Sequence, residues 1–518
     1  MGAPAANTGD ARSTGAGVTE VPMWIDGAPV EASTGRWIEV VNPATSHRIA
    51  KVPEGGRADV DRAVMAARRA FAGGSWSHAL PAERASVLLR IADLMEEQAA
   101  ELADLEVRNT GKTLRMARDF DLAGSIDNVR FFAGAARNLE GKAAGEYMPG
   151  ITSLLRREPI GVVGSVAPWN YPLQMAVWKI LPAIAAGNSI VFKPASLTPL
   201  TAVRLAQLAT RAGLPDGVLN VITGRGEVVG PVLAAHPEVD MVSLTGDTRT
   251  GAEIMRHAAD GLKRVHLELG GKAPFVVFAD ADLEAAANGA VAAGFINVGQ
   301  DCTAATRIYV QRGAYGPFRR LLLERVGTVR VGDPLDAASD LGPLISQDQR
   351  DRVAGFVGRA VAAGATVTVG GDRPADPGLR AGAYYLPTVI EGARQDAEIT
   401  QREIFGPVLV LLPVDDESDA VAKSNDVEYG LAASVWTKDV QRALRMARDL
   451  HFGTVWVNEH IPIASEMPHG GFRHSGTGKD MSQYGFDEHT VVKHVALDLT
   501  GAVRKPWHEI VWRGDRGA

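Results

Sequence analysis

The sequence predicts an α/β protein made of two parallel sheets with crossover helices. A chain of 518 residues exceeds what one ordinary core holds, and its 46% hydrophobic and 22% charged residues are typical of a soluble globular protein. After Ile160, short β-branched runs alternate with helical stretches, which is the pattern of strands joined by helices. A second such series begins near Gly270. We therefore expect two α/β units in succession.

Apolar residues at spacings of three and four predict two amphipathic helices within residues 57–110. Further helices are expected where this spacing returns between the β-branched runs. The predicted strands of the first unit are residues 161–169, 188–194, 218–224 and 239–246, and those of the second are residues 273–278, 306–311, 365–371, 408–414 and 454–459.

Charge and hydropathy exclude several classes of function. A formal net charge of -7 supplies no basic surface for nucleic acid. The most apolar stretch, residues 175–192, is interrupted by Lys179, Pro182 and Asn188, so it falls short of the roughly 20 apolar residues of a membrane span. Residues 1–20 lack the apolar core of a signal peptide and are predicted to form a flexible tail of a cytoplasmic protein.

Two glycine-containing turns follow predicted strands, where α/β sheets bind their ligands. VITGRGEVVG carries Gly226 and Gly230, which leave room for a phosphate or simply make a tight turn. SLTGDTRTG carries Gly246 at a helix N-terminus, which attracts anions. Asp247 in that turn would repel a diphosphate, so a capping role is the alternative. Lys193 ends a strand, where it can reach ribose hydroxyls or remain a solvated charge.

Three residues indicate nucleophilic catalysis. Cys302, the only cysteine, lies in a loop between a helix and a strand, and Glu268 is a carboxylate inside an otherwise apolar strand. Asn170 adds an amide that can stabilise an oxyanion. A buried small side chain is the alternative for the cysteine and an ion pair for the glutamate. The histidines form no HExxH motif and a single cysteine forms no CxxC, so no catalytic metal is predicted.

Seven motifs occur in the order VAPWNYP, VFKP, LTGDTRTG, LELGGKAP, GQDC, EIFGPVL and HGGFRHSGTGKD. Together they resemble the NAD(P)-dependent aldehyde dehydrogenase superfamily. The resemblance implies a homo-oligomer, dimer or tetramer, with a β-ribbon arm. The implied parts are a dinucleotide-binding domain at 21–140 and 160–269, a catalytic domain at 270–480, the oligomerisation arm at 141–159 and 481–500, and a C-terminal extension at 501–518.

The resemblance also implies a role for each catalytic residue. Cys302 would attack the aldehyde, with Asn170 and the Cys302 backbone N–H stabilising the oxyanion, and hydride would leave for the cofactor. Glu268 would activate the water that hydrolyses the thioester. Lys179 and Asp480 match positions proposed as a proton relay to Glu268.

The implied cofactor is NAD, with NADP as an alternative. Ser196 stands where many NAD-preferring relatives have an acid that repels a 2'-phosphate, and Asp247 replaces the usual serine of the diphosphate turn. The predicted cofactor-binding residues are Trp169, Lys193, Ser196, Gly226, Gly230, Gly246, Asp247, Glu403 and Phe405.

Within the superfamily, GQDCTAATR and MPHGGFRHSGTGKDMSQYG most resemble bacterial aminobutyraldehyde dehydrogenases. The expected substrate is therefore 4-aminobutanal, or its cyclic form 1-pyrroline. Asp121, near Asp119, would receive the ammonium group at the tunnel mouth, and Tyr171, Trp178 and Ile463 would line the pocket. A solvated acid pair is the alternative for the two aspartates.

Other readings of the sequence stay open. Betaine aldehyde dehydrogenase or a broad-specificity aldehyde dehydrogenase is the alternative enzyme. A non-catalytic dinucleotide-binding relative, favoured only by Asp247, is a third possibility. An enzyme that passes the acyl group to coenzyme A is disfavoured because that subgroup generally lacks the glutamate at the Glu268 position.

Overall fold

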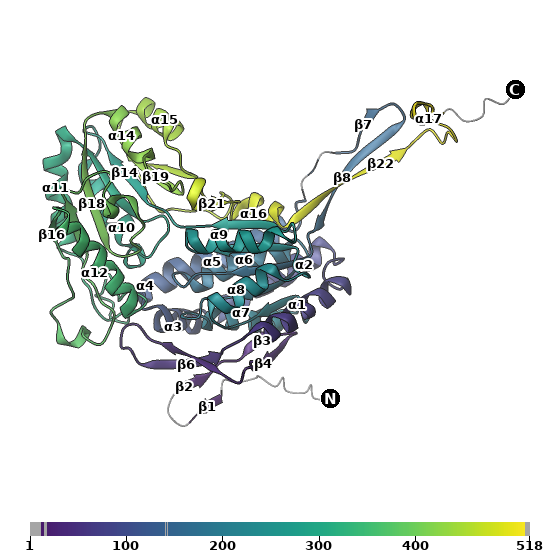
Figure 1. The fold of residues 1–518 in the computed structure, drawn as a ribbon, viewed down its shortest axis with the longest axis horizontal. Helices are drawn as coiled ribbons and strands as arrows, with labels where there is room; N and C mark the ends of the chain where they lie inside the picture. Colours follow the sequence, from purple (N-terminus) through teal and green to yellow (C-terminus); the bar gives the residue numbers. More distant parts are fainter. Residues whose placement is uncertain (1–11, 15–17, 140, 142, 513–518) are drawn as a thin grey trace.

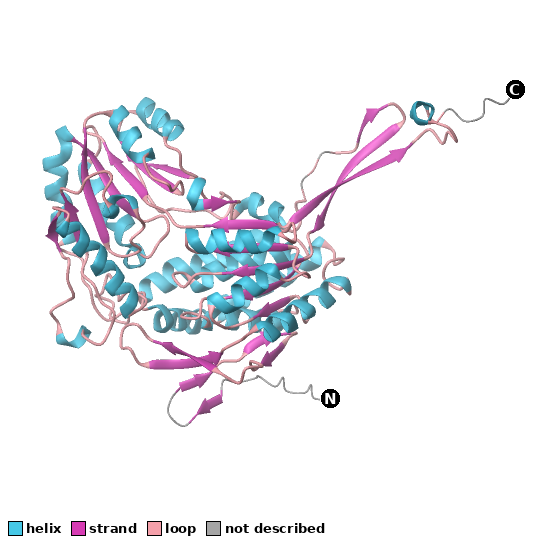
Figure 2. Ribbon diagram, in the orientation of Figure 1, coloured by secondary structure: helices cyan, strands magenta, loops and turns pink. Residues whose placement is uncertain are grey.

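The computed structural model describes residues 12–14, 18–139, 141 and 143–512. Within these residues the strands form four sheets, of which two are large and build the body of the molecule (Figure 1). A third sheet extends from the body as an arm. The chain belongs to the α/β class, as the sequence predicted, with helices covering the large sheets (Figure 2).

The first large sheet has eight described strands in the order β21-β13-β12-β9-β10-β11-β3-β4. Neighbouring strands from β13 to β11 are parallel, so their carboxyl ends meet at one edge. The strands are β3 (Met23–Ile25), β4 (Ala28–Val30), β9 (Val162–Val166), β10 (Ser189–Lys193), β11 (Leu219–Val221), β12 (Met241–Thr245), β13 (Arg264–Glu268) and β21 (Gly476–Thr477).

Helices cover both faces of this sheet, each face with its own apolar cluster. One face carries α1 (Arg57–Ala72), α8 (Gly226–Ala235) and α9 (Thr248–Ala259). The other carries α2 (Pro81–Glu97), α5 (Ala123–Ala135), α6 (Pro172–Ala185), α7 (Leu200–Arg211) and α16 (Ser482–Glu488).

Residues 57–110 form three helices where the sequence predicted two. The additional helix is α3 (Ala99–Thr110), which is separated from α2 by Gln98. Gln98 has φ -110° and ψ 22°, outside the helical region, although no proline or glycine marks the break. After α3 come α4 (Leu114–Met116) and a π-helical segment, Ala117–Leu122.

The second large sheet has seven strands among the described residues, in the order β16-β17-β18-β15-β14-β19-β20. Only β16 runs antiparallel to its neighbour. The strands are β14 (Ala273–Val277), β15 (Ala305–Gln311), β16 (Thr366–Val369), β17 (Thr388–Glu391), β18 (Val408–Val414), β19 (Ala432–Trp436) and β20 (Thr454–Val457). The sequence did not predict β17 or β19.

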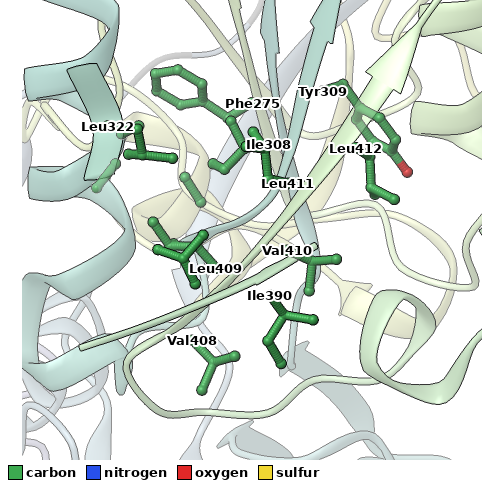
Figure 3. Packing of buried hydrophobic residues seen from close by; sticks show 14 of the residues in the cluster. Phe275, Ile308, Tyr309, Leu322, Ile390, Val408, Leu409, Val410, Leu411 and Leu412 are labelled. Carbon is green, nitrogen blue, oxygen red and sulfur yellow. The ribbon is translucent and has the colours of Figure 1, made fainter. Parts of the chain in front are cut away.

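Branched and aromatic side chains fill the core of this second unit. Phe275, Ile308 and Leu411, from three adjacent strands, are buried against Leu322 of a covering helix (Figure 3). The helices of this unit are α10 (Leu283–Phe295), α11 (Arg312–Val326), α12 (Gln347–Ala362), α13 (Glu398–Gln401), α14 (Glu417–Asn425) and α15 (Val440–Asp449), with short 3-10 turns at Pro377–Leu379 and Arg473–Ser475.

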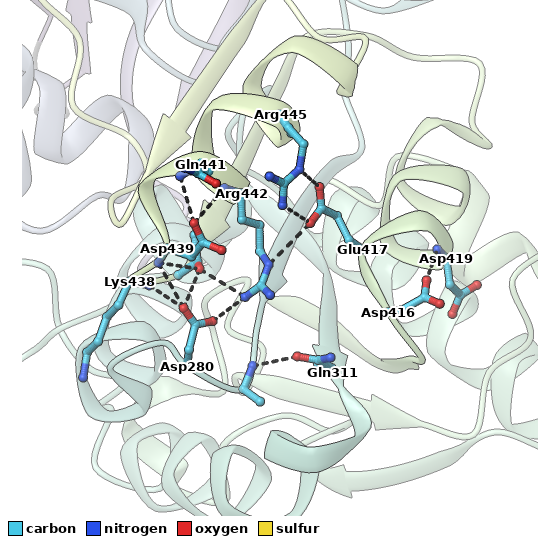
Figure 4. Close-up of polar contacts among 12 residues, drawn as sticks. Asp280, Gln311, Asp416, Glu417, Asp419, Lys438, Asp439, Gln441, Arg442 and Arg445 are labelled. Atoms are coloured by element: carbon cyan, nitrogen blue, oxygen red, sulfur yellow. Dashed lines mark hydrogen bonds and ion pairs between the residues drawn. The ribbon is translucent and has the colours of Figure 1, made fainter.

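Hydrogen bonds and ion pairs link the segment after β14 to α14 and α15 (Figure 4). The Asp280 carboxylate, just after β14, accepts from the Thr437 hydroxyl at 2.8 Å and from Arg442 Nη1 at 2.7 Å. Glu417, at the start of α14, accepts from Arg445 Nε at 2.7 Å. These hydrogen bonds and ion pairs join α14 and α15 to the segment that follows β14. The site lies at the opposite ends of the strands.

The arm consists of β7 (Gly145–Met148), β8 (Ile151–Pro159) and β22 (Thr490–Asp498), with β8 in the centre. At its far end lies α17 (Pro506–Val511) (Figure 1). A small sheet near the N-terminus contains β1 (Arg12–Thr14), β2 (Val18–Glu20), β5 (Trp37–Val41) and β6 (Arg48–Pro53). The strands β1 and β2 therefore lie in the segment predicted to be a flexible tail. Residues 1–11 and 15–17 of that tail, and residues 513–518 of the predicted C-terminal extension, are outside the described residues. No helix in the described part of the chain has the length and apolar character needed to cross a membrane.

Candidate active site

A cavity of about 690 Å³ opens at the carboxyl ends of β9, β10, β12 and β13 and reaches the second unit. The parallel strands deliver their following residues to this one edge. Most predicted site residues line it: Cys302, Glu268, Asn170, Trp169, Lys193, Ser196, Gly226, Gly246, Asp247, Glu403, Phe405, Tyr171, Trp178 and Ile463. Four predicted residues do not line it: Lys179, Asp480, Gly230 and Asp121.

A sharp loop after α10 presents Cys302. Asn297, Val298 and Gly299 have φ of 47°, 60° and 69°, so three successive residues are left-handed. A Cβ on Gly299 would lie 2.2 Å from the Gly406 carbonyl oxygen, which explains why glycine stands there. The loop turns the chain back toward β15 and exposes Cys302 to the cavity.

The side chains of Glu268, Cys302 and His469 meet in the cavity, each with an O, S or N atom within 4.8 Å of the others. Burial, together with the negative charge of Glu268, raises the pKa of the Cys302 thiol well above its usual value. Glu268 itself is 1% exposed, and its Oε1 has no hydrogen-bond partner among the described residues. A neutral thiol and an unsatisfied carboxylate oxygen therefore face the same space.

Asn170 lies beside the cysteine loop. Its side-chain Nδ2 donates to the Gln300 backbone carbonyl at 3.0 Å. Its backbone carbonyl accepts from Asn297 Nδ2 at 2.9 Å and from Lys112 Nζ at 3.0 Å. Because an amide nitrogen has two N–H donors, one remains for an oxygen bound at Cys302. This is the donor that an oxyanion site needs.

Lys179 and Asp480 form a buried ion pair, with Lys179 Nζ donating to the two carboxylate oxygens at 3.0 and 2.7 Å. The Asp480 backbone N–H donates to the His469 carbonyl at 2.8 Å, and the His469 N–H returns the bond at 2.9 Å. Nearby His266 has its pKa well below its usual value because of burial and the Lys179 charge. The ion pair is thus linked to His469 through the Asp480 backbone. Its role as a proton relay to Glu268 stays a prediction.

Asp121 requires a correction, because it is 1% exposed and forms an ion pair with Lys112 inside the protein. Asp121 lies in the π-helical segment Ala117–Leu122, and its side chain faces inward. Asp119 is exposed and accepts from Arg118 Nε at 2.6 Å. Neither aspartate reaches the cavity.

Gly230 also needs correcting. It lies inside α8, where a Cβ would contact Ile254 at 4.0 Å, so it faces α9. Gly226, the first residue of that helix, does line the cavity. One glycine of the turn therefore serves helix packing and only the other faces the site.

The predicted cofactor half of the cavity suits an anion at one end. Lys193 is 3% exposed, and burial lowers its pKa to about 8. Arg249, which sequence reasoning missed, also lines this part, and the buried Thr245 hydroxyl has no partner among the described residues. Asp247 caps α9 by accepting from the Thr250 N–H at 3.0 Å. The capping alternative for Asp247 is thus realised.

At the other end of this half, Glu403 accepts from the Gly271 N–H at 2.9 Å, and burial raises its pKa to about 7. Trp169 and Phe405 face one another edge to face, with ring centroids 5.2 Å apart. A buried carboxyl group and an aromatic pair therefore line the cavity together with Cys302.

Asp301 and His469 are functional candidates that sequence reasoning missed, and both line the cavity. Asp301 Oδ2 accepts from the Tyr171 hydroxyl at 2.6 Å, while Oδ1 accepts from the Thr303 N–H at 2.7 Å. Asp301 stands next to the cysteine in the GQDC motif, which was the available signal. His469 is the first residue of the motif HGGFRHSGTGKD, but its closeness to Glu268 arises only on folding.

Sequence comparison decides the family. The model of the aldehyde dehydrogenase family matches residues 30–495. The chain belongs to the aldehyde dehydrogenase family. Its Cys302, Glu268 and Asn170 meet at the cavity in the way the motifs predicted, and the enzyme class expected from the sequence is confirmed.

Relatives of this aldehyde dehydrogenase include a betaine aldehyde dehydrogenase of Bacillus subtilis, 42% identical over 475 residues, which cover 91% of this chain and 96% of the relative. Among solved structures, betaine aldehyde dehydrogenase from Staphylococcus aureus in complex with NAD+ has a TM-score of 0.91 and 39% identity, covering 93% of this chain and 96% of that one. A point mutant of the same enzyme, also with NAD+, gives the same TM-score and identity. These relatives favour the betaine aldehyde alternative over the aminobutyraldehyde subgroup.

Proposed function

We propose that this protein oxidises an aldehyde with a cationic head group, first of all betaine aldehyde, to its carboxylic acid, with NAD as hydride acceptor. The observation that carries the proposal is the meeting of Cys302, Glu268 and Asn170 in a cavity that also contains Asp301. The relatives that bind NAD+ and the name of the B. subtilis enzyme support it.

The cofactor half of the cavity fits a dinucleotide. Lys193 and Arg249 supply positive charge beside the carboxylates of Glu227 and Asp247, the Thr245 hydroxyl has no partner among the described residues, and Gly226 leaves the start of α8 open. When bound, NAD accepts a hydride from the substrate carbon. We infer that Glu403 holds ribose hydroxyls. Ser196 adds no charge against a 2'-phosphate, so NADP stays the second candidate.

The protein's own side chains divide the remaining chemistry. Cys302, once deprotonated, forms the bond to the aldehyde carbon, and Asn170 Nδ2 donates to the oxygen that becomes negative. After oxidation the acyl group is held as a thioester on the sulfur. The Glu268 carboxylate then removes a proton from the attacking water, and its unsatisfied Oε1 is the acceptor for that proton.

We place the cationic head group of the substrate against the cavity wall opposite the proposed cofactor site. Tyr171 and Trp178 line this wall, and Phe120 lies with its ring centroid 6.4 Å from that of Tyr171. Lys112 Nζ lies 4.4 Å from the Tyr171 ring centroid and His469 packs against the Trp178 ring, so a substrate would use the remaining face of each ring. Trp178 Nε1 donates to Asn128 at 2.7 Å, which fixes the indole. A quaternary ammonium group is attracted by aromatic faces and by the Asp301 carboxylate without needing a hydrogen bond.

A second candidate, 4-aminobutanal, is favoured by one specific observation. Asp301 offers carboxylate oxygens, and a primary ammonium can donate hydrogen bonds to them, whereas a trimethylammonium cannot. Asp301 would then take the role that the sequence had assigned to Asp121.

A substrate panel with matched neutral analogues tests the proposal. We expect kcat/KM for betaine aldehyde to exceed that for 3,3-dimethylbutanal, its uncharged isostere, and 4-aminobutanal to exceed pentanal in the same way. The ratio of the two charged aldehydes decides between the candidates. Equal or higher kcat/KM for the neutral analogues would contradict recognition of a cation.

The variant Asp301→Asn keeps the shape of the side chain and removes its charge. We expect kcat/KM to fall about tenfold or more for 4-aminobutanal, because a hydrogen bond to a charged group is worth about 1.5–3 kcal/mol. For betaine aldehyde, which forms no such bond, we expect a smaller fall from the lost charge attraction. The neutral analogues are the internal control and should change far less. Equal losses for all aldehydes would show that Asp301 acts only by holding Tyr171 and Thr303.

A further inference from the structure

We propose that Cys302, Glu268 and His469 bind one Zn²⁺ ion, and that this binding inhibits the enzyme. The three side chains come from the end of β13, the loop before β15 and the segment after β20, yet their ligand atoms lie within 4.8 Å of one another. No sequence-local metal motif could reveal this set. The binding is independent of the proposed function; only the inhibition rests on it.

Apart from their contacts with one another and with Cys302, the ligand atoms of Glu268 and His469 lack hydrogen-bond partners among the described residues. Glu268 Oε1 and both ring nitrogens of His469 have no hydrogen bond among the described residues, although the side chains are buried. His469 Nε2 lies 3.6 Å from Glu268 Oε1. By contrast, the buried His460 has both nitrogens occupied, by Ser434 Oγ and the Thr303 carbonyl, each at 2.8 Å. The buried imidazole of His469 therefore has ring nitrogens available to a ligand bound in the cavity.

The donor set matches Zn²⁺ in type and charge. A thiolate and an imidazole are ligands that Zn²⁺ prefers, while Mg²⁺ and Ca²⁺ prefer oxygen. Cys302 as thiolate and Glu268 as carboxylate together carry the two negative charges that balance the ion. On binding, the S–H bond of Cys302 breaks, the Zn–S bond forms, and the proton passes to solvent.

Three protein ligands leave the fourth tetrahedral position for a water molecule. The atoms that hold the ion are those proposed to attack the aldehyde and to activate water. Metal binding and turnover therefore exclude one another, and aldehyde should compete with the ion at Cys302.

Metal retention is measured directly, without turnover. The full-length protein, freed of thiol reagents, is loaded with ZnCl2, desalted and analysed for zinc per chain, and the same is done with CoCl2 while the thiolate-to-cobalt absorption band is recorded. We expect one ion per chain and a band that is absent in Cys302→Ala. Less than one retained ion, or cobalt binding with no thiolate band, would overturn the site.

The variant His469→Phe removes one ligand, and His474→Phe is its matched control. His474 is an exposed histidine of the same loop, with Nδ1 3.6 Å from Glu428. We expect the Zn²⁺ concentration for half-inhibition to rise about tenfold or more in His469→Phe and to be unchanged in the control. If His469→Phe has little activity, zinc retention measures the same loss.

Three results separate the outcomes. Zinc retained at one ion per chain in a protein that oxidises no aldehyde would refute the proposed function and leave the metal site standing. Inhibition that is equal in wild type and His469→Phe would refute the site. Inhibition relieved by EDTA and by excess aldehyde would support both.

Discussion

Cys302 is held as a neutral thiol in the resting protein, because burial and the Glu268 carboxylate both raise its pKa. The benefit is protection, since the thiolate is the form that is oxidised and alkylated. The cost is a smaller reactive fraction at neutral pH. In the proposed mechanism, Asn170 would offset part of this cost by stabilising the oxygen that becomes charged when the sulfur attacks.

Glu403 predicts a pH dependence of cofactor binding. Burial raises its pKa to about 7, with Glu268 acting in the same direction and the Gly271 N–H, Arg352 and Lys272 opposing it. The side chain is therefore a charged acceptor above about pH 7 and a neutral acid below it. We expect KM for NAD to rise as pH falls from about 8 to 6.

The control for this effect is Glu403→Gln, which cannot change charge. It should have a higher KM for NAD at pH 8 and a flatter pH profile. An unchanged pH profile in that variant would show that another group titrates.

Four residues show what sequence reasoning can find and what it cannot. Cys302 and Glu268 were found because a thiol and a buried carboxylate are unusual in their local contexts. Asp121 was misplaced because the resemblance to aminoaldehyde enzymes put an acid at the tunnel mouth, whereas here the side chain is buried against Lys112. His469 was missed because its role depends on contact with residues far away in the sequence.

At the scale of elements, strands were predicted best where both faces are buried, because continuous apolar runs such as β14 and β18 leave few alternatives. The strand β19, AASVW, was missed since alanine and serine carry little strand preference. The break between α2 and α3 was missed because it has no glycine or proline. All the same, the predicted strand ends already placed the site at the correct edge of the sheet.

The segment containing Asp121 supports Asn170, the proposed oxyanion residue, through Lys112. Lys112 pairs with Asp121 and donates to the Asn170 backbone carbonyl at 3.0 Å. The ion pair thus holds the Asn170 backbone in place. We expect Asp121→Asn to lower kcat/KM by a similar factor for charged and neutral aldehydes. It should also reduce the free energy of unfolding by about 3 kcal/mol, because Lys112 loses its partner in a buried site.

Urea unfolding and the aldehyde panel measure these two effects. Asp119→Asn, two residues away and exposed, is the matched control and should change neither. A loss confined to the charged aldehydes would instead place Asp121 in contact with the substrate.

At the scale of the whole molecule, the arm predicts self-association. β22 is an edge strand of the arm, and Tyr147, Met148, Val492 and Leu497 expose 68, 61, 57 and 46% of their surface. Such an edge with apolar side chains favours pairing with another chain. We propose a homo-oligomer, so light scattering should give a dimer or tetramer of the 54.9 kDa chain.

The double variant Val492→Asp with Leu497→Asp should shift this mass toward the monomer. Leu444→Asp, on the exposed side of α15 in the body, is the control and should leave the mass unchanged. A wild-type protein that is monomeric at micromolar concentration would refute the role of the arm.

The division of labour between Cys302 and Glu268 joins both units of the molecule, and one measurement tests it most directly. Glu268→Gln is mixed rapidly with NAD and the aldehyde of highest kcat/KM, and NADH absorbance and the mass of the Cys302 peptide are followed. Because the substitution removes the charge that opposes the thiolate but also the base for water, we expect about one NADH per active site, slow later turnover and an acyl group on Cys302. Steady-state turnover equal to wild type, or a Cys302 peptide of unchanged mass, would contradict the account.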